Sequence, residues 1–417
     1  MHPPDPAASV TILGAGIVGI CTALCLLERG VKVTVIDKSA PGQETSMGNA
    51  GVVSPWSIIP QSVPGIWKTI PKLMLGRFGP LSIDPRSAPD MLPWGLRFLR
   101  QGKERHVRTT AAAMSHLCGP SIELYQRHLS GTGHENLIVE SMYVHAFRDA
   151  RRADLTSLDY RIRAEMGADL ERIGKESLAQ LEPALGPAFK AAVLIKGQAR
   201  VRSPGKLGQV LAEKARALGA DFRRTKVKRI NRSAPNVWRV ECNGMTLESD
   251  RIVLCLGVWS RGLLEQLGLA VPLMAERGYH VEFNSPGIEI NNSVMDMDAK
   301  VVASSMQGGL RVAGQAEFAP VDAPPNPRRQ RQLTKIARSA FPALRADQVR
   351  FWMGRRPSFP DSLPALGTVP GHPGLFANFG HSHYGLMMAP SSGEILARIL
   401  CNERQNIDLK PYAIDRF

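Results

Sequence analysis

With 417 residues, 44% of them hydrophobic, the chain is long enough to bury a large core and suits two domains better than one. It has no apolar run near the roughly 20 residues of a transmembrane helix, and its N-terminus lacks a basic, proline-free start, so we predict a cytoplasmic protein without a signal peptide. The net charge of +15 is compatible with an anionic lipid surface, a nucleic acid or an anionic substrate. The basic residues are scattered without an aromatic–basic motif, which favours a solvated surface and no nucleic-acid partner.

The most informative stretch is Ser9–Lys38, which is typical of a strand, a glycine-rich turn, an apolar helix and a second strand. Gly14, Gly16 and Gly19 follow the first strand, Val10–Leu13, with the G-x-G-x-x-G spacing. We expect the first glycine to allow a tight turn, the second to let the backbone approach a pyrophosphate, and the third to let helix and strand pack closely. The helix N-terminus would then direct free N–H groups at the phosphates.

Asp37 ends the second strand at the position where a ribose-binding carboxylate belongs in a dinucleotide-binding unit. Because strand, glycines, helix, second strand and acid follow one another in register, we predict that this unit binds a dinucleotide. Its predicted cofactor contacts are Leu13, Gly14, Ala15, Gly16, Ile17, Val18, Gly19, Asp37 and Lys38.

The polar loop of residues 39–60 comes next, and its small residues would let the backbone lie against a flat ligand. The segment Pro64–Leu99 alternates prolines with large apolar residues, such as Trp67 and Phe78, and with cations such as Arg77. Two interpretations of this segment stay open: an interfacial element that touches a membrane, or an irregular cap packed over the active site.

The rest of the sequence shows segments with the helical period of three to four residues and segments with the strand period of two residues. Helices are predicted at His106–Leu129, Arg151–Gly186, Ser203–Leu218, Arg329–Phe341 and Pro390–Leu400. Strands of the nucleotide domain are predicted at Thr225–Ile230, Arg251–Leu256 and Leu375–Phe379, a short strand at Leu137–Phe147, and strands of an antiparallel substrate sheet at Tyr279–Phe283, Lys300–Ser304 and Gly309–Gly314.

The chain therefore returns to its first domain after building a second one. We predict an α/β protein in which a Rossmann-type nucleotide-binding domain (residues 1–56, 195–270 and 355–417) is interleaved with an α+β substrate-binding domain (57–194 and 271–354) built on an antiparallel sheet.

Four stretches together resemble the FAD-dependent D-amino-acid oxidase superfamily: ETSMGNAGVVSP, AERGYHV, WMGRRPSFPDSLPALG and NFGHSHYGLMMAPSSGEILA. The similarity extends from about Ser9 to about Leu400, and within the superfamily the chain looks like the bacterial D-amino-acid dehydrogenases. The resemblance implies non-covalently bound FAD and oxidative deamination of a D-amino acid or a related secondary amino acid, by hydride transfer from Cα to flavin N5. It also implies a quinone-type electron acceptor, and a peripheral position on the inner membrane stays open.

The same resemblance assigns cofactor contacts beyond the glycine-rich unit. Thr45, Ser46, Asn49, Ala50 and Gly51 would line the pyrophosphate and flavin, Val227 the adenine, Gly257 the pyrophosphate, and the GHSHYG turn from Gly380 to Gly385, with Leu386, the isoalloxazine. The WMGRRP block has no cysteine nearby, which disfavours covalent flavin attachment.

A substrate carboxylate needs a planar partner with two donors, which only arginine provides. Arg356 holds the position at which the superfamily keeps that arginine, with a structural ion pair as the alternative; Arg355 would point the other way in an extended segment. Four other residues are expected to face the substrate, with a satisfied hydrogen bond in the sheet or turn as the alternative: Tyr279, His280, His383 and Tyr384. Because Tyr279 and His280 alternate on a strand, we expect only one of them to reach the flavin.

Two other functions stay open. One is an oxidase or dehydrogenase of glycine, sarcosine or D-hydroxyproline, and the other is a flavoprotein that serves RNA modification, which only the positive charge supports.

Overall fold

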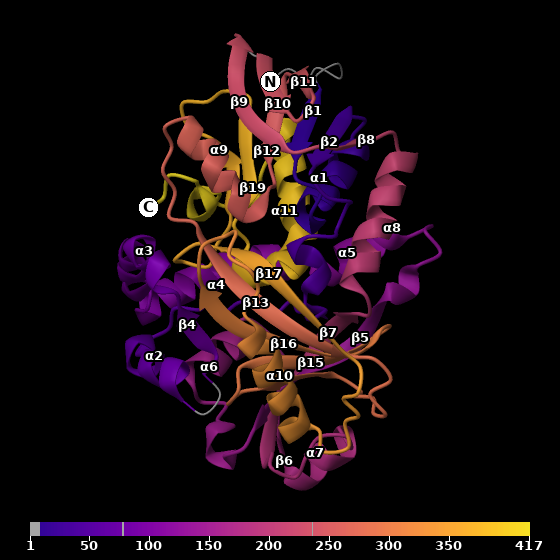
Figure 1. Cartoon of the computed structure of the whole chain (residues 1–417), viewed down its shortest axis with the longest axis vertical. Coiled ribbons are helices and arrows are strands. Elements are labelled where there is room, and N and C mark those ends of the chain that lie inside the picture. Colours follow the sequence, from indigo (N-terminus) through magenta and orange to yellow (C-terminus); the bar gives the residue numbers. More distant parts are fainter. Residues whose placement is uncertain (1–8, 77–78, 236) are drawn as a thin grey trace.

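The computed structural model describes residues 9–76, 79–235 and 237–417. Met1–Ala8, for which no signal peptide is predicted, and Arg77, Phe78 and Asn236 lie outside the described residues. The described chain forms two large sheets and one small sheet, and the strands of the two large sheets alternate along the sequence (Figure 1). The predicted α/β class, with a Rossmann-type sheet interleaved with a largely antiparallel one, is confirmed.

The six-stranded sheet contains the predicted βαβ unit. Its order is β18-β19-β12-β1-β2-β8, and all its neighbours are parallel except β18 and β19. The strands are β1 (Val10–Leu13), β2 (Val33–Asp37), β8 (Asp221–Arg224), β12 (Arg251–Leu254), β18 (Ala365–Thr368) and β19 (Leu375–Phe379). Because β1 pairs with both β2 and β12, it lies inside the sheet, which explains why every residue of this apolar strand is buried.

α1 (Ile17–Leu27) and α11 (Gly385–Leu400) pack on this sheet, α8 (Pro204–Ala217) packs on α1, and α9 (Ser260–Gln266) packs on β9 (Val227–Ala234) of the small sheet. Ser203 caps α8, where its hydroxyl accepts a hydrogen bond from the Lys206 N–H (3.4 Å), and Pro204 is the first helical residue, as predicted. α1 and α11 cross closely at Gly393, because a Cβ there would lie 2.9 Å from the Cys21 backbone.

α11 begins at Gly385, five residues before the predicted start at Pro390. Proline has no N–H to donate to the carbonyl four residues earlier, so a proline inside a helix leaves that carbonyl without its usual partner. Here the buried Tyr125 hydroxyl donates to the Leu386 carbonyl (2.6 Å). A side chain from α5 (Ser121–Leu129) therefore replaces the missing backbone donor and lets the helix continue through Pro390.

The small antiparallel sheet consists of β9 (Val227–Ala234), β10 (Val237–Cys242) and β11 (Met245–Ser249). The strand predicted at Thr225–Ile230 falls in β9 and thus in this sheet, not in the six-stranded one. The buried Trp238 ring joins the core under the six-stranded sheet, and its indole N–H donates to the Pro373 carbonyl (2.9 Å).

The ten-stranded sheet has the order β17-β13-β16-β15-β14-β5-β7-β3, with β4 beside β16 and β6 beside β7. Its pairs are antiparallel except β5–β14 and β4–β16. The strands are β3 (Val52–Val53), β4 (Leu81–Ile83), β5 (Ile138–Phe147), β6 (Leu170–Gly174), β7 (Ala191–Val201), β13 (Met274–Phe283), β14 (Ser293–Asp296), β15 (Val301–Met306), β16 (Gly309–Phe318) and β17 (Val349–Ser358). α10 (Pro327–Ala340) packs Leu333 and Ile336 on one face of the sheet.

The remaining helices are α2 (Ile66–Leu75), α3 (Ala88–Arg100), α4 (Glu104–Cys118), α5 (Ser121–Leu129), α6 (Leu158–Glu165) and α7 (Lys175–Leu181). Short 3₁₀ turns occur at Thr45–Gly48, Pro85–Ser87, Glu135–Leu137, Ala150–Arg152, Gly257–Trp259, Ser382–Tyr384 and Lys410–Tyr412. Among the described residues, no helix is both long and apolar enough to cross a bilayer.

Two predicted helices are wrong in extent. His106–Leu129 is divided into α4 and α5, because Gly119-Pro120 interrupts the helical bonding. Arg151–Gly186 contains α6, β6 and α7 instead of one helix: Gly167 has a φ of +98°, and the residues after it pair with β7. The residue limits of the two domains stay a prediction, although β7, which crosses the predicted limit at residue 195, belongs wholly to the ten-stranded sheet.

Candidate active site

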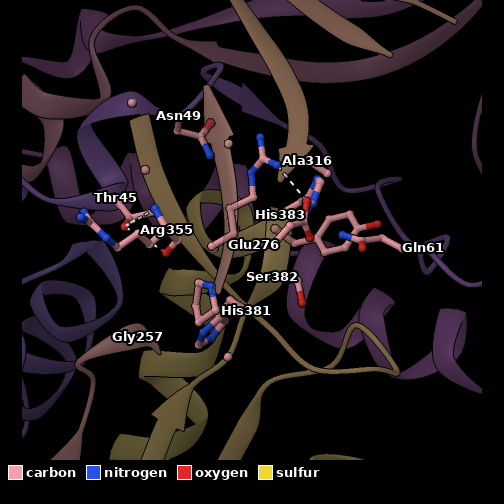
Figure 2. Close-up of a pocket in the computed structure, with 18 of the residues that line it drawn as sticks. Thr45, Asn49, Gln61, Gly257, Glu276, Ala316, Arg355, His381, Ser382 and His383 are labelled. Carbon is pink, nitrogen blue, oxygen red and sulfur yellow. Dashed lines mark hydrogen bonds and ion pairs between the residues drawn. The ribbon is translucent and has the colours of Figure 1, made fainter. Parts of the chain in front are cut away.

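A cavity of about 1030 Å³ lies where the carboxyl ends of β1 and β2 meet one face of the ten-stranded sheet. Figure 2 shows part of its lining, with Thr45 and Arg355 on one side and Glu276 and His383 on the other. The predicted residues that line it are Gly16, Ile17, Val18, Asp37, Lys38, Thr45, Ser46, Asn49, Ala50, Val227, Gly257, Tyr279, Arg356, Gly380, His383, Tyr384, Gly385 and Leu386. The predicted residues that do not are Leu13, Gly14, Ala15, Gly19, Gly51 and His280.

The three motif glycines differ in what surrounds them. Gly14 has a φ of +112°, and a Cβ there would lie 2.4 Å from the Cys255 carbonyl oxygen, so the tight turn requires glycine. A Cβ on Gly19 would lie 1.9 Å from the Gly14 carbonyl oxygen, so the helix packs closely on the glycine turn, whereas the close approach was expected between helix and strand. A Cβ on Gly16 would have Ser46 Oγ, at 3.5 Å, as its nearest neighbour. The protein itself therefore leaves the space at Gly16 open, on the side of the cavity.

Asp37 braces the glycine turn. Its carboxylate accepts hydrogen bonds from the Ala15 N–H (2.7 Å) and the Ser39 N–H (2.8 Å), and burial raises the pKa of the carboxyl. Each carboxylate oxygen has a second lone pair, so the group can also accept hydrogen bonds from ribose hydroxyls. At the start of α1, the Ile17 N–H donates to Ser46 Oγ (3.0 Å).

The ten-stranded sheet holds the loop that carries Ser46. Thr45 Oγ1 donates to the Arg355 carbonyl (3.1 Å; Figure 2), and Arg311 Nη1 donates to the Asn49 carbonyl (2.7 Å). A Cβ on Gly48 would lie 1.9 Å from the Trp352 ring, so this loop and β17 are in direct contact. The part of the cavity beside the glycine turn and the part lined by the ten-stranded sheet are thus fixed relative to each other.

His280 and Tyr279 point to opposite faces of β13, as predicted. The buried His280 ring stacks on Trp352, with centroids 5.0 Å apart, and its Nδ1 bonds the Gly48 carbonyl (3.0 Å). Burial and the nearby Arg311 lower the pKa of His280 to about 3. His280 thus supports the loop of residues 45–51, and its part in substrate contact stays a prediction.

Tyr279 belongs to the face covered by α10. Its ring stacks on Phe351, with centroids 5.6 Å apart, and its hydroxyl donates to Glu317. Burial and the Glu317 carboxylate raise the pKa of Tyr279 to about 12. Its hydroxyl is therefore occupied in the sheet, and a substrate contact stays a prediction.

Arg356, Glu276 and His383 form a charged cluster on the cavity face. Glu276 is 2% exposed and accepts hydrogen bonds from Arg356 Nη1 (2.9 Å), His383 Nε2 (2.5 Å) and Ser358 Oγ (3.0 Å). Burial alone would raise the pKa of the Glu276 carboxyl, but His383, Arg356 and Ser358 together lower it to about 2. Burial lowers the pKa of His383, against the opposing effect of Glu276. At neutral pH the cluster thus contains a guanidinium, a carboxylate and a neutral imidazole.

Gly278 makes room for the guanidinium of Arg356. A Cβ on Gly278 would lie 2.1 Å from Arg356 Nη2, so only glycine lets the side chain lie flat over β13. Arg356 Nη1 also donates to the Gln315 carbonyl (2.8 Å), whereas Nη2 has only a long contact with the Gly314 carbonyl (3.5 Å). Nη2 is therefore the donor with capacity left for a ligand.

Three more polar side chains lie at the same end of the cavity. Gln61 Nε2 and Ser382 Oγ are buried and have no hydrogen-bond partner within the described part of the chain, although both residues line the cavity (Figure 2). The Tyr384 hydroxyl donates to the Ile59 carbonyl (2.8 Å), and burial raises its pKa. Buried polar atoms without partners are costly, so Gln61 and Ser382 are candidates for ligand contacts.

Glu276 is a site residue that the sequence did not indicate, and Gln61 is another. Glu276 lies two residues before Gly278 in AERGYHV and therefore on the same face of β13, and it pairs directly with Arg356 across the antiparallel ladder. The available signal for Glu276 was an acidic residue in a largely buried strand of a protein that is expected to hold a substrate-binding arginine. The register that joins residues 80 apart in the chain is not readable from local pattern.

The residues present fit a dinucleotide with a flat ring system. The open space at Gly16, the α1 N-terminus and Asp37 fit a pyrophosphate and a ribose, and Ser382 Oγ offers an unpaired polar atom within the GHSHYG turn. We expect non-covalent binding, because the six cysteines are all free and buried and none lines the cavity except Cys255 under the glycine turn.

Comparison with known proteins agrees with this geometry. The family model described as FAD dependent oxidoreductase (DAO) matches residues 9–399. The D-amino-acid oxidase of Bradyrhizobium diazoefficiens is 34% identical over 415 residues, which cover 98% of each chain. The glycine oxidase structure from Geobacillus kaustophilus superposes with a TM-score of 0.75 and is 21% identical, over 98% of this chain and 99% of that one. The iminodiacetate oxidase structure from Chelativorans sp. BNC1 superposes with a TM-score of 0.73 and is 22% identical, over 97% of this chain and 98% of that one. The chain therefore belongs to the DAO family of FAD-dependent oxidoreductases.

Proposed function

We propose that the protein catalyses the oxidative deamination of a D-amino acid, or of a related secondary amino acid, and passes the electrons to a quinone-type acceptor. The observation that carries the proposal is the cluster of Arg356, Glu276 and His383 across the cavity from the dinucleotide cradle. The relative named D-amino-acid oxidase supports the substrate class. When bound, FAD supplies the acceptor for the hydride that leaves the substrate Cα.

Arg356 would bind the substrate carboxylate. Its guanidinium is fixed by Glu276 and the Gln315 carbonyl, and Nη2 keeps free donor capacity toward the cavity. A guanidinium held by its other donors is pre-organised, so little freedom is lost when it binds a carboxylate. Gln61 Nε2, an unpaired donor on the cavity wall, can supply a second hydrogen bond.

Glu276 and His383 would receive the amino group. The buried carboxylate of Glu276 complements an ammonium, so Arg356 and Glu276 together match the two charges of an amino-acid zwitterion. The ammonium must lose a proton before Cα can release a hydride, because the nitrogen lone pair stabilises the positive charge that develops. A neutral His383 that donates from Nε2 to Glu276 keeps a lone pair on Nδ1 for that proton.

An apolar end of the same cavity supports a lipid-soluble acceptor. The inward sides of α2 and α3 line it with Ile66, Ile70, Leu73 and Met91. A quinone ring and its isoprenoid tail would be complementary to such a lining. We therefore propose a cytoplasmic enzyme at the periphery of the inner membrane.

Anaerobic mixing of the FAD-loaded protein with single substrates tests the proposal. We would follow loss of the oxidised flavin absorbance with D-alanine, other D-amino acids, cis-4-hydroxy-D-proline, sarcosine, glycine and L-proline. We expect bleaching by D-amino acids, and its loss in Arg356→Ala but not in Arg338→Ala, an exposed arginine of α10. Bleaching only by glycine or sarcosine would change the substrate class from D-amino acids to these compounds. No bleaching by any of the substrates would refute amino-acid oxidation.

The acceptor needs a separate experiment. Turnover with a soluble quinone should exceed turnover with oxygen at equal substrate saturation. Equal rates would make the protein an oxidase and remove the quinone part of the proposal.

A further inference from the structure

We infer that α2 and α3 form a docking surface for an anionic phospholipid membrane. Both helices lie on the left edge of the molecule in Figure 1. The inference rests on the proposed function only for its purpose, because the surface itself is defined by exposed residues outside the charged cluster of the active site.

Exposed apolar side chains are concentrated on these two helices. Among the described residues, eight large hydrophobic side chains are exposed, and six of them belong to α2 and α3. They are Trp67, Met74 and Leu75 on α2, and Leu92, Leu96 and Leu99 on α3, with exposed fractions that reach 88% at Leu75 and 69% at Leu92. Exposed apolar residues gathered in one place mark an interaction site, whereas single ones are ordinary.

The helical spacing explains how both sides of each helix become apolar. Ile66, Ile70 and Leu73 recur every three or four residues on the cavity side of α2. On α3, Leu92 and Leu96 lie one turn apart on the outward side, opposite Trp94, which is buried against Phe318, and the half-exposed Leu99 near the helix end also borders the cavity. The inward side of α3 is thus anchored by the buried Trp94, and that of α2 borders the cavity, whereas the outward apolar side chains of both helices stay exposed among the described residues.

The charged side chains of α2 and α3 indicate which kind of partner would bind this surface. α2 contains Lys68 and Lys72 and no acid, and α3 contains Arg97 and Arg100. In the part of the chain that the structure describes, none of these four cations forms an ion pair, whereas the one acid of α3, Asp90, pairs with Arg261 (3.4 Å). Apolar and tryptophan side chains among unpaired cations are typical of elements that lie in the interface of an anionic bilayer.

Docking by this surface would also place the lipid next to the active-site cavity. The two helices that would enter the interface have their inner sides on the cavity wall. A lipid-dissolved electron acceptor would then be supplied from the side on which the cavity is apolar.

Vesicle co-sedimentation of the FAD-loaded protein tests this inference. We expect binding to vesicles of equal parts phosphatidylcholine and phosphatidylglycerol, and roughly tenfold weaker binding to phosphatidylcholine alone. Leu92→Gln/Leu96→Gln should weaken binding at least roughly tenfold, because two deeply inserted leucines are lost. Leu218→Gln, which changes an exposed leucine (48%) at the end of α8, should leave it unchanged.

Two further readouts identify what binds. The Trp67 fluorescence, taken as the difference between wild type and Trp67→Phe, should shift to the blue with anionic vesicles. Lys68→Gln/Lys72→Gln should weaken binding at physiological salt more than Lys335→Gln, an exposed lysine of α10. Equal binding by all variants, or none by the wild type, would overturn the inference. Concentration-dependent dimers that disappear in Leu92→Gln/Leu96→Gln would assign the surface to a second copy of the chain instead.

The flavin absorbance of the same samples separates this inference from the proposed function. Vesicle binding without bleaching by any amino acid would leave the membrane surface in place and remove the substrate assignment. Bleaching without vesicle binding would keep the substrate assignment and remove the membrane surface.

Discussion

Single residues set the charge of the substrate end of the cavity. The Arg356 guanidinium and the Glu276 carboxylate are both held in place before a ligand arrives, and their opposite charges face the same space. A ligand with only a carboxylate must share the guanidinium with Glu276, whereas an amino acid also supplies an ammonium that Glu276 can bind. Under the proposed function, the pair would therefore select zwitterions over simple acids.

Glu276→Gln tests this selection. The substitution removes the charge but keeps the size of the side chain, so we expect the KM for a D-amino acid to rise by roughly tenfold or more, since a hydrogen bond to a charged group contributes about 1.5–3 kcal/mol. Propionate, which has no amino group, should bind at least as tightly as to the wild type, because Arg356 is no longer neutralised. Inhibition constants and KM values measured side by side give the comparison, with the exposed Glu248→Gln as control. Equal weakening of both ligands would mean that Glu276 only positions Arg356.

His383→Gln tests proton removal from the substrate. The pKa of His383 is lowered by burial, so the neutral form is present at pH 7 and is lost as the pH falls below the ordinary histidine range near 6.5. The wild-type rate should therefore decline on the acid side. At neutral pH the variant should be roughly a hundredfold slower, and the loss should shrink at alkaline pH, where the free amine forms without a base. A loss of the same size at every pH would refute proton acceptance; the exposed His116→Gln serves as control.

At the scale of elements, Pro390 inside α11 depends on a side chain of another helix. Tyr125→Phe should lower the free energy of unfolding by about 1–3 kcal/mol, because the buried Leu386 carbonyl then loses its donor. In the Pro390→Ala background the cost should shrink, since residue 390 now donates from its own N–H. Denaturant unfolding of the two single variants and the double variant measures the difference.

Tyr412→Phe is the matched control for this cycle. The Tyr412 hydroxyl is equally buried and donates to the carbonyl of Ala113 in α4 (2.6 Å). Four residues on, Leu117 has the N–H that Pro390 lacks, so the Tyr412 variant should cost less. An equal cost for both tyrosines, or no coupling with Pro390→Ala, would contradict the explanation.

Elements with a strong local signal were predictable from the sequence. The βαβ unit, α8 and β19 have apolar periods, caps or flanking glycines that fix their type within a few residues. The extent of α6 was not predictable, because the strand that follows it exists only by pairing with β7. Pro390 pointed to a helix start, and only the distant Tyr125 hydroxyl explains why the helix begins earlier.

The candidate site shows the same division. Arg356 and the cofactor loop could be named from motifs, because the residues in them are close in sequence. The Arg356–Glu276 pair, the structural bonds of Tyr279 and the role of Gly278 depend on the register of β13 with β16 and β17. Local pattern gives the face of each residue but not its cross-strand neighbour.

At the scale of the whole molecule, the cofactor would connect the two large sheets. The cavity is lined by Gly16 and Asp37 at the carboxyl ends of β1 and β2 and by Trp352 and Arg355 of the ten-stranded sheet, so a dinucleotide bound there would contact both sheets. A ligand that binds only the folded state adds to its stability, by about 2.7 kcal/mol when free FAD is roughly a hundredfold above its Kd. Removal of FAD should therefore lower Tm, and Tm should rise with the logarithm of added FAD.

Substitution of two glycines of the G-x-G-x-x-G motif distinguishes stabilisation by bound FAD from stabilisation by close packing within the protein. Gly16→Ala places its Cβ 3.5 Å from the nearest protein atom, so the apoprotein should keep its Tm while the FAD-dependent increase shrinks. Gly19→Ala drives its Cβ against the Gly14 carbonyl oxygen, so the apoprotein itself should lose about 1–3 kcal/mol of unfolding free energy. Thermal unfolding of both variants with and without FAD makes the comparison. If Gly16→Ala destabilised the apoprotein as much as Gly19→Ala, the open space at Gly16 would be part of the fold and not a place for the pyrophosphate.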